Sequence, residues 1–216
     1  MTSLFEKLVN NKSIALVGPS SSLEGKNLGK EIDSHDIVIR MNRFYYFENF
    51  KHDYGEKVNI VFKSFYDNDA YKLKDRNIDL FVMGSYTKRL KTPKNIENFN
   101  KSKKILPHIK HENLLPMSKE IENLLLSYRT RRTTGIWCFC YLINFIDIIK
   151  NIDIYGFDLG YNGYIKNYHK ERRGKNNTIL VGAINNDIHN LNEETRIFKT
   201  LYEKNTENIQ IKDAKF

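Results

Sequence analysis

The chain is poor in cysteine, proline and tryptophan. Its 216 residues include two cysteines, four prolines and one tryptophan. Two cysteines are too few for a disulfide scaffold, and Cys138 and Cys140 lie only two positions apart in an apolar segment, where they cannot comfortably bridge to each other. We predict two buried free thiols in a reducing compartment, with no metal or nucleophilic role, because no histidine or third thiol lies near them in the sequence.

Long apolar runs are also absent. The longest apolar window, residues 136–149, is interrupted by Asn144 and Asp147, whereas a membrane-spanning helix needs about 18 or more apolar residues. Residues 1–12 contain no apolar region typical of a signal peptide. We therefore expect a cytoplasmic protein, or one at the cytoplasmic face of a membrane.

Negative charge is in the minority. Lysine and arginine number 35 against 26 aspartates and glutamates, which gives a net charge of +9. Such a balance suits nucleic acid, an anionic membrane surface or an anionic substrate. The sequence has no zinc-ligand array, no aromatic RNA-binding motif and no long basic helix, so no specific nucleic acid is expected. An anionic substrate is favoured, together with peripheral contact with an anionic membrane.

Apolar runs that resemble strands alternate with helical segments along the chain. This alternation predicts an α/β fold with a doubly wound, mostly parallel sheet, and the length suits one domain, residues 1–216. Helices are expected over 118–128, 136–149 and 193–203, and a last edge strand over 208–212. Polar stretches at 86–113 and 160–187 are candidate substrate loops. The other expected strands are 14–17, 37–41, 58–62, 80–83, 104–106 and 152–155.

The most informative segment is residues 14–42. An apolar strand ends in Gly18, Pro19 and three serines, and a short polar helix then leads to a second apolar strand. A turn at the carboxyl end of a parallel strand is the usual place for a nucleotide, because backbone N–H groups there favour an anion. The predicted donor-binding residues of this turn are Gly18, Ser20, Ser21 and Ser22.

The same segment resembles sialylmotif L of the animal-type sialyltransferases. The resemblance extends over about thirty positions, so it is far more specific than a lone glycine motif. It implies a Rossmann-like fold of the glycosyltransferase A-like kind, and it adds Asn42 to the donor site. The matching residues are Val17, Gly18, Ser20, Leu23, Gly25, Gly29, residues 31–35, Arg40, Met41 and Asn42.

A second segment resembles sialylmotif S. It begins at Arg131 and Arg132, continues through Thr133, Thr134 and Gly135 into an apolar helix, and ends in a strand closed by residues 155–157. A hydroxyl-rich turn at a helix N-terminus provides a second anion or ribose site. The alternative is N-capping by Thr133 or Thr134 alone. The resemblance implies that Arg131, Thr133, Thr134, Gly135 and Phe157 bind the donor.

Two late histidines complete the resemblance. His189 is followed five residues later by Glu194, just before the last predicted helix, as in the final family motif and in the bacterial lipooligosaccharide sialyltransferases, which the chain also resembles. The resemblance implies that His189 is the catalytic base. His169 is the candidate to neutralise the donor phosphate, with Tyr161, Tyr164 and Tyr168 as alternatives. Glu194 either supports the helix or is a solvated acid of its first turn.

The chain departs from the family pattern at several places. Pro19 replaces the family's asparagine, so one donor contact is missing or is supplied by a serine. The family's disulfide cysteines and its N-terminal membrane anchor have no counterpart in this sequence, which suits a cytoplasmic enzyme. Asp67, Asn68 and Asp69 resemble a metal-binding Asp-x-Asp motif, but that motif serves pyrophosphate donors, so we expect a solvated loop, no metal and no cofactor.

The predicted reaction is an inverting, metal-independent transfer of sialic acid from CMP-sialic acid to a hydroxyl of a glycan or glycolipid acceptor. Two alternatives stay within glycosyl transfer: a CMP-Kdo donor, which no residue here distinguishes, and a pyrophosphate donor, which would need a metal. A third is a non-catalytic nucleotide- or RNA-binding α/β protein, which predicts strongly salt-dependent binding to RNA.

Overall fold

The structure is a computed structural model that describes residues 2–63, 72–73, 75–83, 100, 104, 106–113, 117–126, 132–158 and 190–213. Nine residues singled out from the sequence lie outside these ranges. They are Asp67, Asn68, Asp69, Arg131, Tyr161, Tyr164, Tyr168, His169 and His189.

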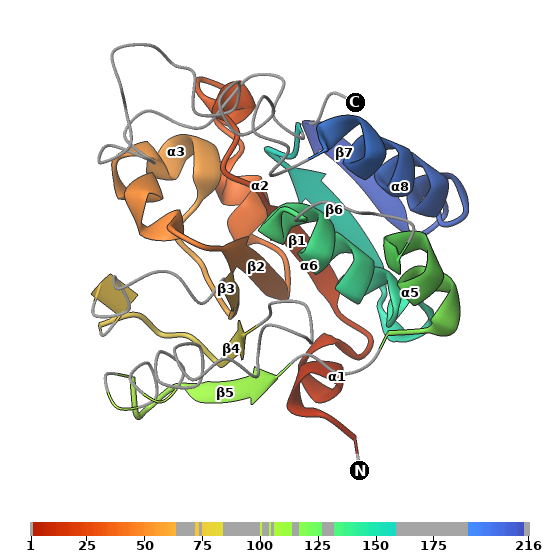
Figure 1. The fold of residues 1–216 in the computed structure, drawn as a ribbon. Helices are drawn as coiled ribbons and strands as arrows, with labels where there is room; N and C mark the ends of the chain where they lie inside the picture. Colours follow the sequence, from red (N-terminus) through yellow and green to blue (C-terminus); the bar gives the residue numbers. More distant parts are fainter. Residues whose placement is uncertain are drawn as a thin grey trace.

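In the described part of the chain, seven strands form one sheet in the order β5-β4-β3-β2-β1-β6-β7, and every neighbouring pair is parallel (Figure 1). Strand order reverses beside β1, because the chain builds outward to β5 and then returns to place β6 against the other side of β1. This confirms the predicted doubly wound α/β fold. The strands are β1 Ser13–Val17, β2 Ile37–Met41, β3 Ile60–Lys63, β4 Leu80–Met83, β5 Lys110–Asn113, β6 Asn151–Tyr155 and β7 Ile209–Asp213.

One predicted strand is wrong. Lys104 and Leu106, the two described residues of that segment, are not in a strand. The fifth strand is β5, a short polar segment at the sheet edge. Leu106 is fully buried outside the strands, so its apolar character reflects burial without extended pairing, and Pro107 follows it. An edge strand such as β5 needs few apolar residues, which is why no apolar run marks it in the sequence. The predicted last strand at the other edge is confirmed as β7.

Helices cover both faces of the sheet. The predicted helix 136–149 ends earlier, at Ile143, because Asn144 caps it and turns outward to accept a hydrogen bond from the Ser118 amide at 2.7 Å. The helix α1 was not predicted, although Ser3 and Glu6 have the spacing of a capping box. The helices are α1 Leu4–Val9, α2 Gly29–Asp33, α3 Lys51–Tyr54, α5 Lys119–Leu126, α6 Thr134–Ile143 and α8 Leu191–Glu203, and the 3₁₀ turns are η1 Ser21–Leu23, η2 Phe44–Phe50 and η4 Ile146–Ile148.

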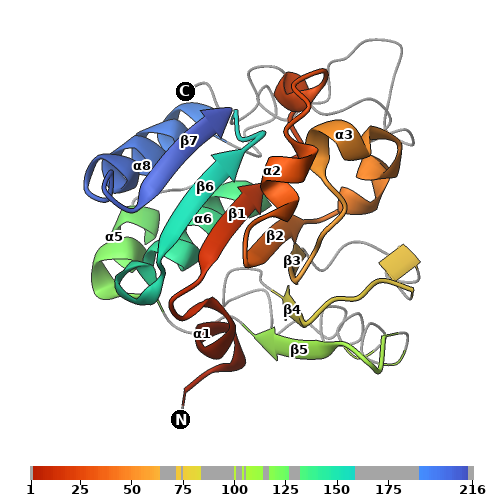
Figure 2. The ribbon, with the colours of Figure 1, turned by 180° about the vertical axis from the view of Figure 1, so that it is seen from behind.

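Alternating side chains of the strands divide the core into two layers. Ile14 and Leu16 of β1 pack with α1, α5, α6, α8 and the 3₁₀ turn η4, whereas Ala15 and Val17 pack with α2, α3 and the 3₁₀ turns η1 and η2. Figure 2 shows α2 and α3 on the second face. Helix α6 lies at the centre of the first layer and is apolar nearly all round, so the amino end of this helix is held rigidly against the sheet. Among the described residues, no helix has the length and apolar character needed to cross a bilayer.

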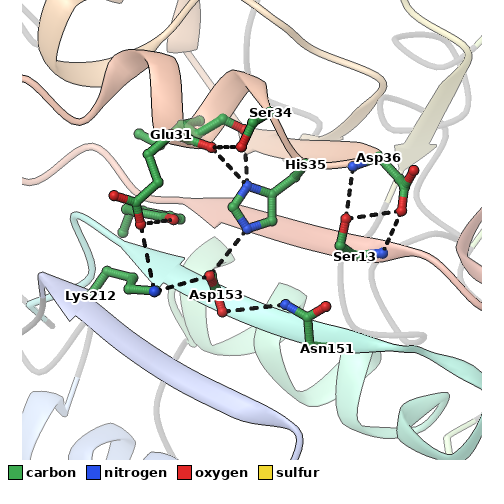
Figure 3. A network of polar contacts seen from close by, with 10 residues as sticks. Ser13, Glu31, Ser34, His35, Asp36, Asn151, Asp153 and Lys212 are labelled. Atoms are coloured by element: carbon green, nitrogen blue, oxygen red, sulfur yellow. Dashed lines mark hydrogen bonds and ion pairs between the residues drawn. The ribbon is translucent and has the colours of Figure 1, made fainter.

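A polar network ties α2 to β6 and β7 (Figure 3). The His35 ring is 7% exposed; its Nδ1 contacts the Glu31 carbonyl at 3.0 Å and its Nε2 lies 3.2 Å from Asp153 Oδ2. Lys212 Nζ lies 3.5 Å from the same carboxylate. The hydrogen bond with Asp153 raises the pKa of His35, although burial opposes this. The network therefore joins α2, β6 and β7 through side chains.

Candidate active site

The two segments with family-like motifs meet where strand order reverses. Gly18 follows β1 and Gly156 follows β6, and these strands are neighbours in the sheet. The Gly18 amide donates to the Tyr155 carbonyl at 2.8 Å, and the Ser20 amide donates to the Gly156 carbonyl at 3.1 Å. Ligands of doubly wound sheets bind at the carboxyl ends of the strands at this kind of reversal. The fold therefore places both segments where a nucleotide site is expected.

Phe157 fills the space between two of the predicted donor-site glycines. A Cβ atom on Gly18 would lie 2.3 Å from the Gly156 carbonyl oxygen and 2.9 Å from the Phe157 ring. A Cβ on Gly135 would lie 3.0 Å from the same ring. Phe157 is only 4% exposed. Both glycines are thus required for the loops to pack together, which is a structural reason for them beside any contact with a ligand.

Ser20 has hydrogen bonds at every polar group. Its hydroxyl donates to Asp158 Oδ2 at 2.6 Å and accepts from the Ser22 amide at 3.1 Å, which caps η1. Its carbonyl accepts a hydrogen bond from the Tyr54 hydroxyl. Ser20 and Asp158 are 2% and 5% exposed, so these bonds are shielded from water. The sequence predicted Ser20 as a donor-binding residue, and that role stays a prediction.

Ser22 differs from Ser20. Its hydroxyl oxygen is buried, and among the described residues nothing forms a hydrogen bond with it. Leaving a buried hydroxyl without a partner costs about 1–3 kcal/mol, and such a group calls for a specific explanation. Ser21, also predicted to bind the donor, is half-buried in the same 3₁₀ turn.

Tyr54 and Arg40 support the serine turn (residues 18–23), and the sequence predicts neither of them as a site residue. Tyr54 is fully buried, and its carbonyl accepts from Arg40 Nη2 at 2.7 Å. Burial and the nearby carboxylates Glu24 and Asp53 raise the pKa of Tyr54, so its hydroxyl keeps its proton and donates. Burial lowers the pKa of Arg40 to about 10, which leaves it charged at neutral pH. The tyrosine could be found only in the structure, because it reaches Ser20 from 34 positions away.

Asn42 and Thr134 connect the two segments directly. Asn42 follows β2 in the left-handed backbone region, with φ at 50°, a conformation that asparagine tolerates better than most residues. Its amide donates to the Phe62 carbonyl at 2.8 Å. The Thr134 hydroxyl lies 3.4 Å from Asn42 Oδ1. Two residues predicted to bind the donor are thereby brought side by side and remain half-buried.

Thr133 caps α6 and is held by Glu194. The Ile136 amide donates to the Thr133 hydroxyl at 3.3 Å, so the predicted capping role is present. The Thr133 amide donates to Glu194 Oε1 at 2.7 Å and its hydroxyl donates to Oε2 at 2.5 Å. Glu194 is fully buried, so the interpretation as a solvated acid is wrong. Its carboxylate lies in the first turn of α8 and binds the residue that caps α6.

Helix α8 begins next to the predicted base. Asn190 caps this helix, and its side chain accepts from the Glu193 amide at 3.1 Å. Position 189 immediately precedes that cap in the sequence. The bonds from Glu194 to Thr133 join the first turn of α8 to the threonine turn (residues 133–136). His189, His169 and Arg131 themselves lie outside the described residues. Among the described residues, which do not include Asp67 and Asp69, no cluster of three or more His, Cys, Asp or Glu side chains could hold a metal.

The chain matches one protein family along most of its length. The model of glycosyltransferase family 29 (sialyltransferase) matches residues 6–206. A mouse protein, CMP-N-acetylneuraminate-beta-galactosamide-alpha-2,3-sialyltransferase 1, is 29% identical over 171 residues, which cover 71% of this chain and 47% of the relative. The chain thus spans about half the length of that curated relative.

Solved structures share the fold. The crystal structure of a mammalian sialyltransferase superposes with a TM-score of 0.56 at 19% identity, covering 97% of this chain and 71% of that chain. A crystal structure of a mammalian sialyltransferase in complex with Gal-beta-1-3GalNAc-ortho-nitrophenol gives a TM-score of 0.59 at 19% identity, covering 98% and 73% of the two chains. At this identity the likeness establishes the architecture alone.

Proposed function

Because the chain belongs to glycosyltransferase family 29, the sialyltransferases, we propose that it transfers sialic acid from CMP-sialic acid to a hydroxyl group of a glycan or glycolipid acceptor. One observation carries this proposal. The serine turn (residues 18–23) and the threonine turn (residues 133–136) pack around Phe157 at the strand-order reversal, where a nucleotide would bind. The name of the mouse relative supports CMP-N-acetylneuraminate as the donor.

The proposed step is a single inverting displacement. The acceptor hydroxyl oxygen forms a bond to the anomeric carbon of the sugar, and its proton passes to His189. The bond from that carbon to the phosphate oxygen breaks, and its electron pair leaves with CMP. The transition state resembles an oxocarbenium ion, so the site must stabilise departing CMP more strongly than bound donor.

The described residues supply the donor side of this step. Asn42 and Thr134 form a polar pair between the two turns, and Ser22 adds a buried hydroxyl without a described partner. His169 or a neighbouring tyrosine is proposed to meet the phosphate, and Arg131 to lie near the phosphate or the sugar carboxylate. A single leaving phosphate can be neutralised by such groups, so the proposal includes metal independence.

The test is CMP release. The purified chain is incubated with CMP-Neu5Ac in EDTA, with and without a galactose-terminated acceptor such as Gal-beta-1-3GalNAc, and CMP is measured by chromatography. We expect release that His189→Ala abolishes while CMP binding is largely kept. His52→Ala is the matched control, because His52 is exposed on α3, and it should behave as the wild type. Unchanged transfer in His189→Ala would remove this residue as the base.

Other outcomes separate the rival functions. Saturable CMP binding without release from CMP-Neu5Ac would point to CMP-Kdo or another donor. Activity lost in EDTA and restored by Mg²⁺ would return attention to Asp67 and Asp69. Binding of RNA that weakens steeply with salt, without CMP binding, would favour the non-catalytic alternative.

The proposed location is the cytoplasm or the cytoplasmic face of a membrane. Support comes from Cys138 and Cys140, which are free and fully buried, as predicted. Burial raises the pKa of Cys140 to about 12, so this thiol is unreactive toward oxidation through its thiolate. Fractionation of cells that express the chain, with and without a high-salt wash, would test both the location and the peripheral membrane contact.

A further inference from the structure

The three serines of the turn have different surroundings. Ser20 is bound at its amide, its carbonyl and its hydroxyl by groups from other elements or from its own turn. Ser22 uses its amide to bond to Ser20, but its buried hydroxyl has no partner among the described residues. A saturated hydroxyl can bind a ligand only by breaking a shielded bond, whereas an unsatisfied one gains a bond from the ligand.

The Tyr54 bond also determines the direction of the next peptide group. The carbonyl of Ser20 and the amide of Ser21 belong to one planar trans peptide, so they point in opposite directions. With the carbonyl held toward Tyr54 behind the turn, the Ser21 amide is directed to the other side. Rotation of this peptide would also carry the Ser22 side chain to a new position, because Ser22 follows within two residues.

Two buried groups therefore fix the turn from different elements. Tyr54 comes from α3 and is anchored by Arg40 of β2, while Asp158 follows β6. Tyr54 is fully buried and Asp158 is 5% exposed, so neither contact competes with water. These bonds tie the turn to strands on both sides of β1.

We propose that Tyr54 and Asp158 are positioning residues of the donor site, which hold Ser20 in a purely structural role so that Ser22 is the serine whose hydroxyl binds the CMP part of the donor. This inference rests on the proposed function. It assigns the hydroxyl that binds the ligand to Ser22 among the three serines of the turn. It also explains why Pro19 is tolerated: Pro19 has no amide hydrogen to donate, and the turn is held through Ser20 instead.

The first test compares two tyrosines. Tyr54→Phe and Tyr155→Phe each remove one buried hydroxyl on the same face of the sheet, but the Tyr155 hydroxyl donates to Glu31 at 2.8 Å, away from the turn. The full chain is titrated with CMP by calorimetry at a temperature where all variants are folded. We expect Tyr54→Phe to weaken CMP binding about tenfold, equivalent to ~1.4 kcal/mol, with a higher donor KM and an unchanged acceptor KM. Tyr155→Phe should bind CMP as the wild type does.

The second test compares two serines. Ser22→Ala should weaken CMP binding about tenfold without lowering the melting temperature, because its hydroxyl has no partner to lose. Ser20→Ala should lower the melting temperature. Wild-type CMP affinity in Tyr54→Phe and Ser22→Ala would overturn the inference while leaving the proposed function intact. Absence of CMP binding in the wild type would overturn both.

Discussion

The serine turn and the threonine turn follow the same local design but are held differently. In each, one hydroxyl accepts from an amide of its own helix and donates to a buried carboxylate far away in the sequence. Asp158 gives Ser20 one carboxylate oxygen, and Tyr54 secures its carbonyl. Glu194 gives Thr133 both oxygens. The serine turn thus depends on the end of β6, and the threonine turn depends on α8, next to the predicted base. Mutations that disrupt the serine turn should weaken donor binding. Mutations that disrupt the threonine turn should weaken donor binding and also lower the rate of catalysis.

Substitutions of the glycines in the two turns should give the largest difference in the free energy of unfolding. Gly18→Ala would place a Cβ 2.3 Å from a backbone oxygen, whereas Gly135→Ala would place one 3.0 Å from the edge of a ring that can shift. We expect Gly18→Ala to lower the free energy of unfolding by about 3 kcal/mol and Gly135→Ala by about 1 kcal/mol. Urea denaturation measures both. Equal losses would mean that the loops are not packed as tightly around Phe157 as described.

Removing the charge of Glu194, the carboxylate that binds the threonine turn, should give the second-largest loss of stability. Glu194→Gln keeps the volume but leaves one of the two Thr133 donors without a good acceptor, so we expect a loss of about 2 kcal/mol, together with a lower kcat. Its matched control is Glu193→Gln, which removes only a surface pair with Arg196 at 2.5 Å and should cost about 0.5 kcal/mol at most. A stable Glu194→Gln variant with full activity would contradict the coupling between the turn and α8.

The carboxylate of the serine turn should matter somewhat less. Asp158→Asn weakens the hydrogen bond that the Ser20 hydroxyl donates, and we expect a loss of about 1.5 kcal/mol in the free energy of unfolding, with a weaker CMP affinity and little change in kcat. A double-mutant cycle with Ser20→Ala isolates this bond. Additive losses in the cycle would show that the two side chains do not act together.

The smallest expected effect is a pH dependence of stability that arises from the His35–Asp153 contact. The pKa of His35 is raised above its ordinary value of 6.5 in the folded state, chiefly by the hydrogen bond with Asp153. Its contribution to stability is therefore fully present below pH 6.5 and is lost as the pH rises through the folded value. Denaturation of the wild type and of His35→Gln across pH 5.5–8.5 should show a decline with pH only in the wild type. Parallel curves would assign the decline to another group.

Local patterns predicted most of the framework. Apolar runs identified six of the seven described strands, and Ser118 and Thr133 mark helix starts that the structure contains. The last helix begins at Leu191, two residues before the predicted start at 193. The fifth strand was not predicted because β5, which contains His111 and Glu112, is a polar edge strand. Helix α6 ended early because Asn144 finds a tertiary partner. Donor contacts of individual side chains stay predictions.

The sequence by itself determined the order of strands and helices and the glycine- and hydroxyl-rich turns, because these depend on near neighbours: periodic burial, capping spacing and backbone freedom. Only the tertiary structure decided which carboxylate meets which hydroxyl. Asp158 reaches Ser20 across 138 positions and Glu194 reaches Thr133 across 61. Such pairs form because the sheet brings distant strand ends together and excludes water there, where a hydrogen-bond partner from the protein replaces water for most buried polar groups.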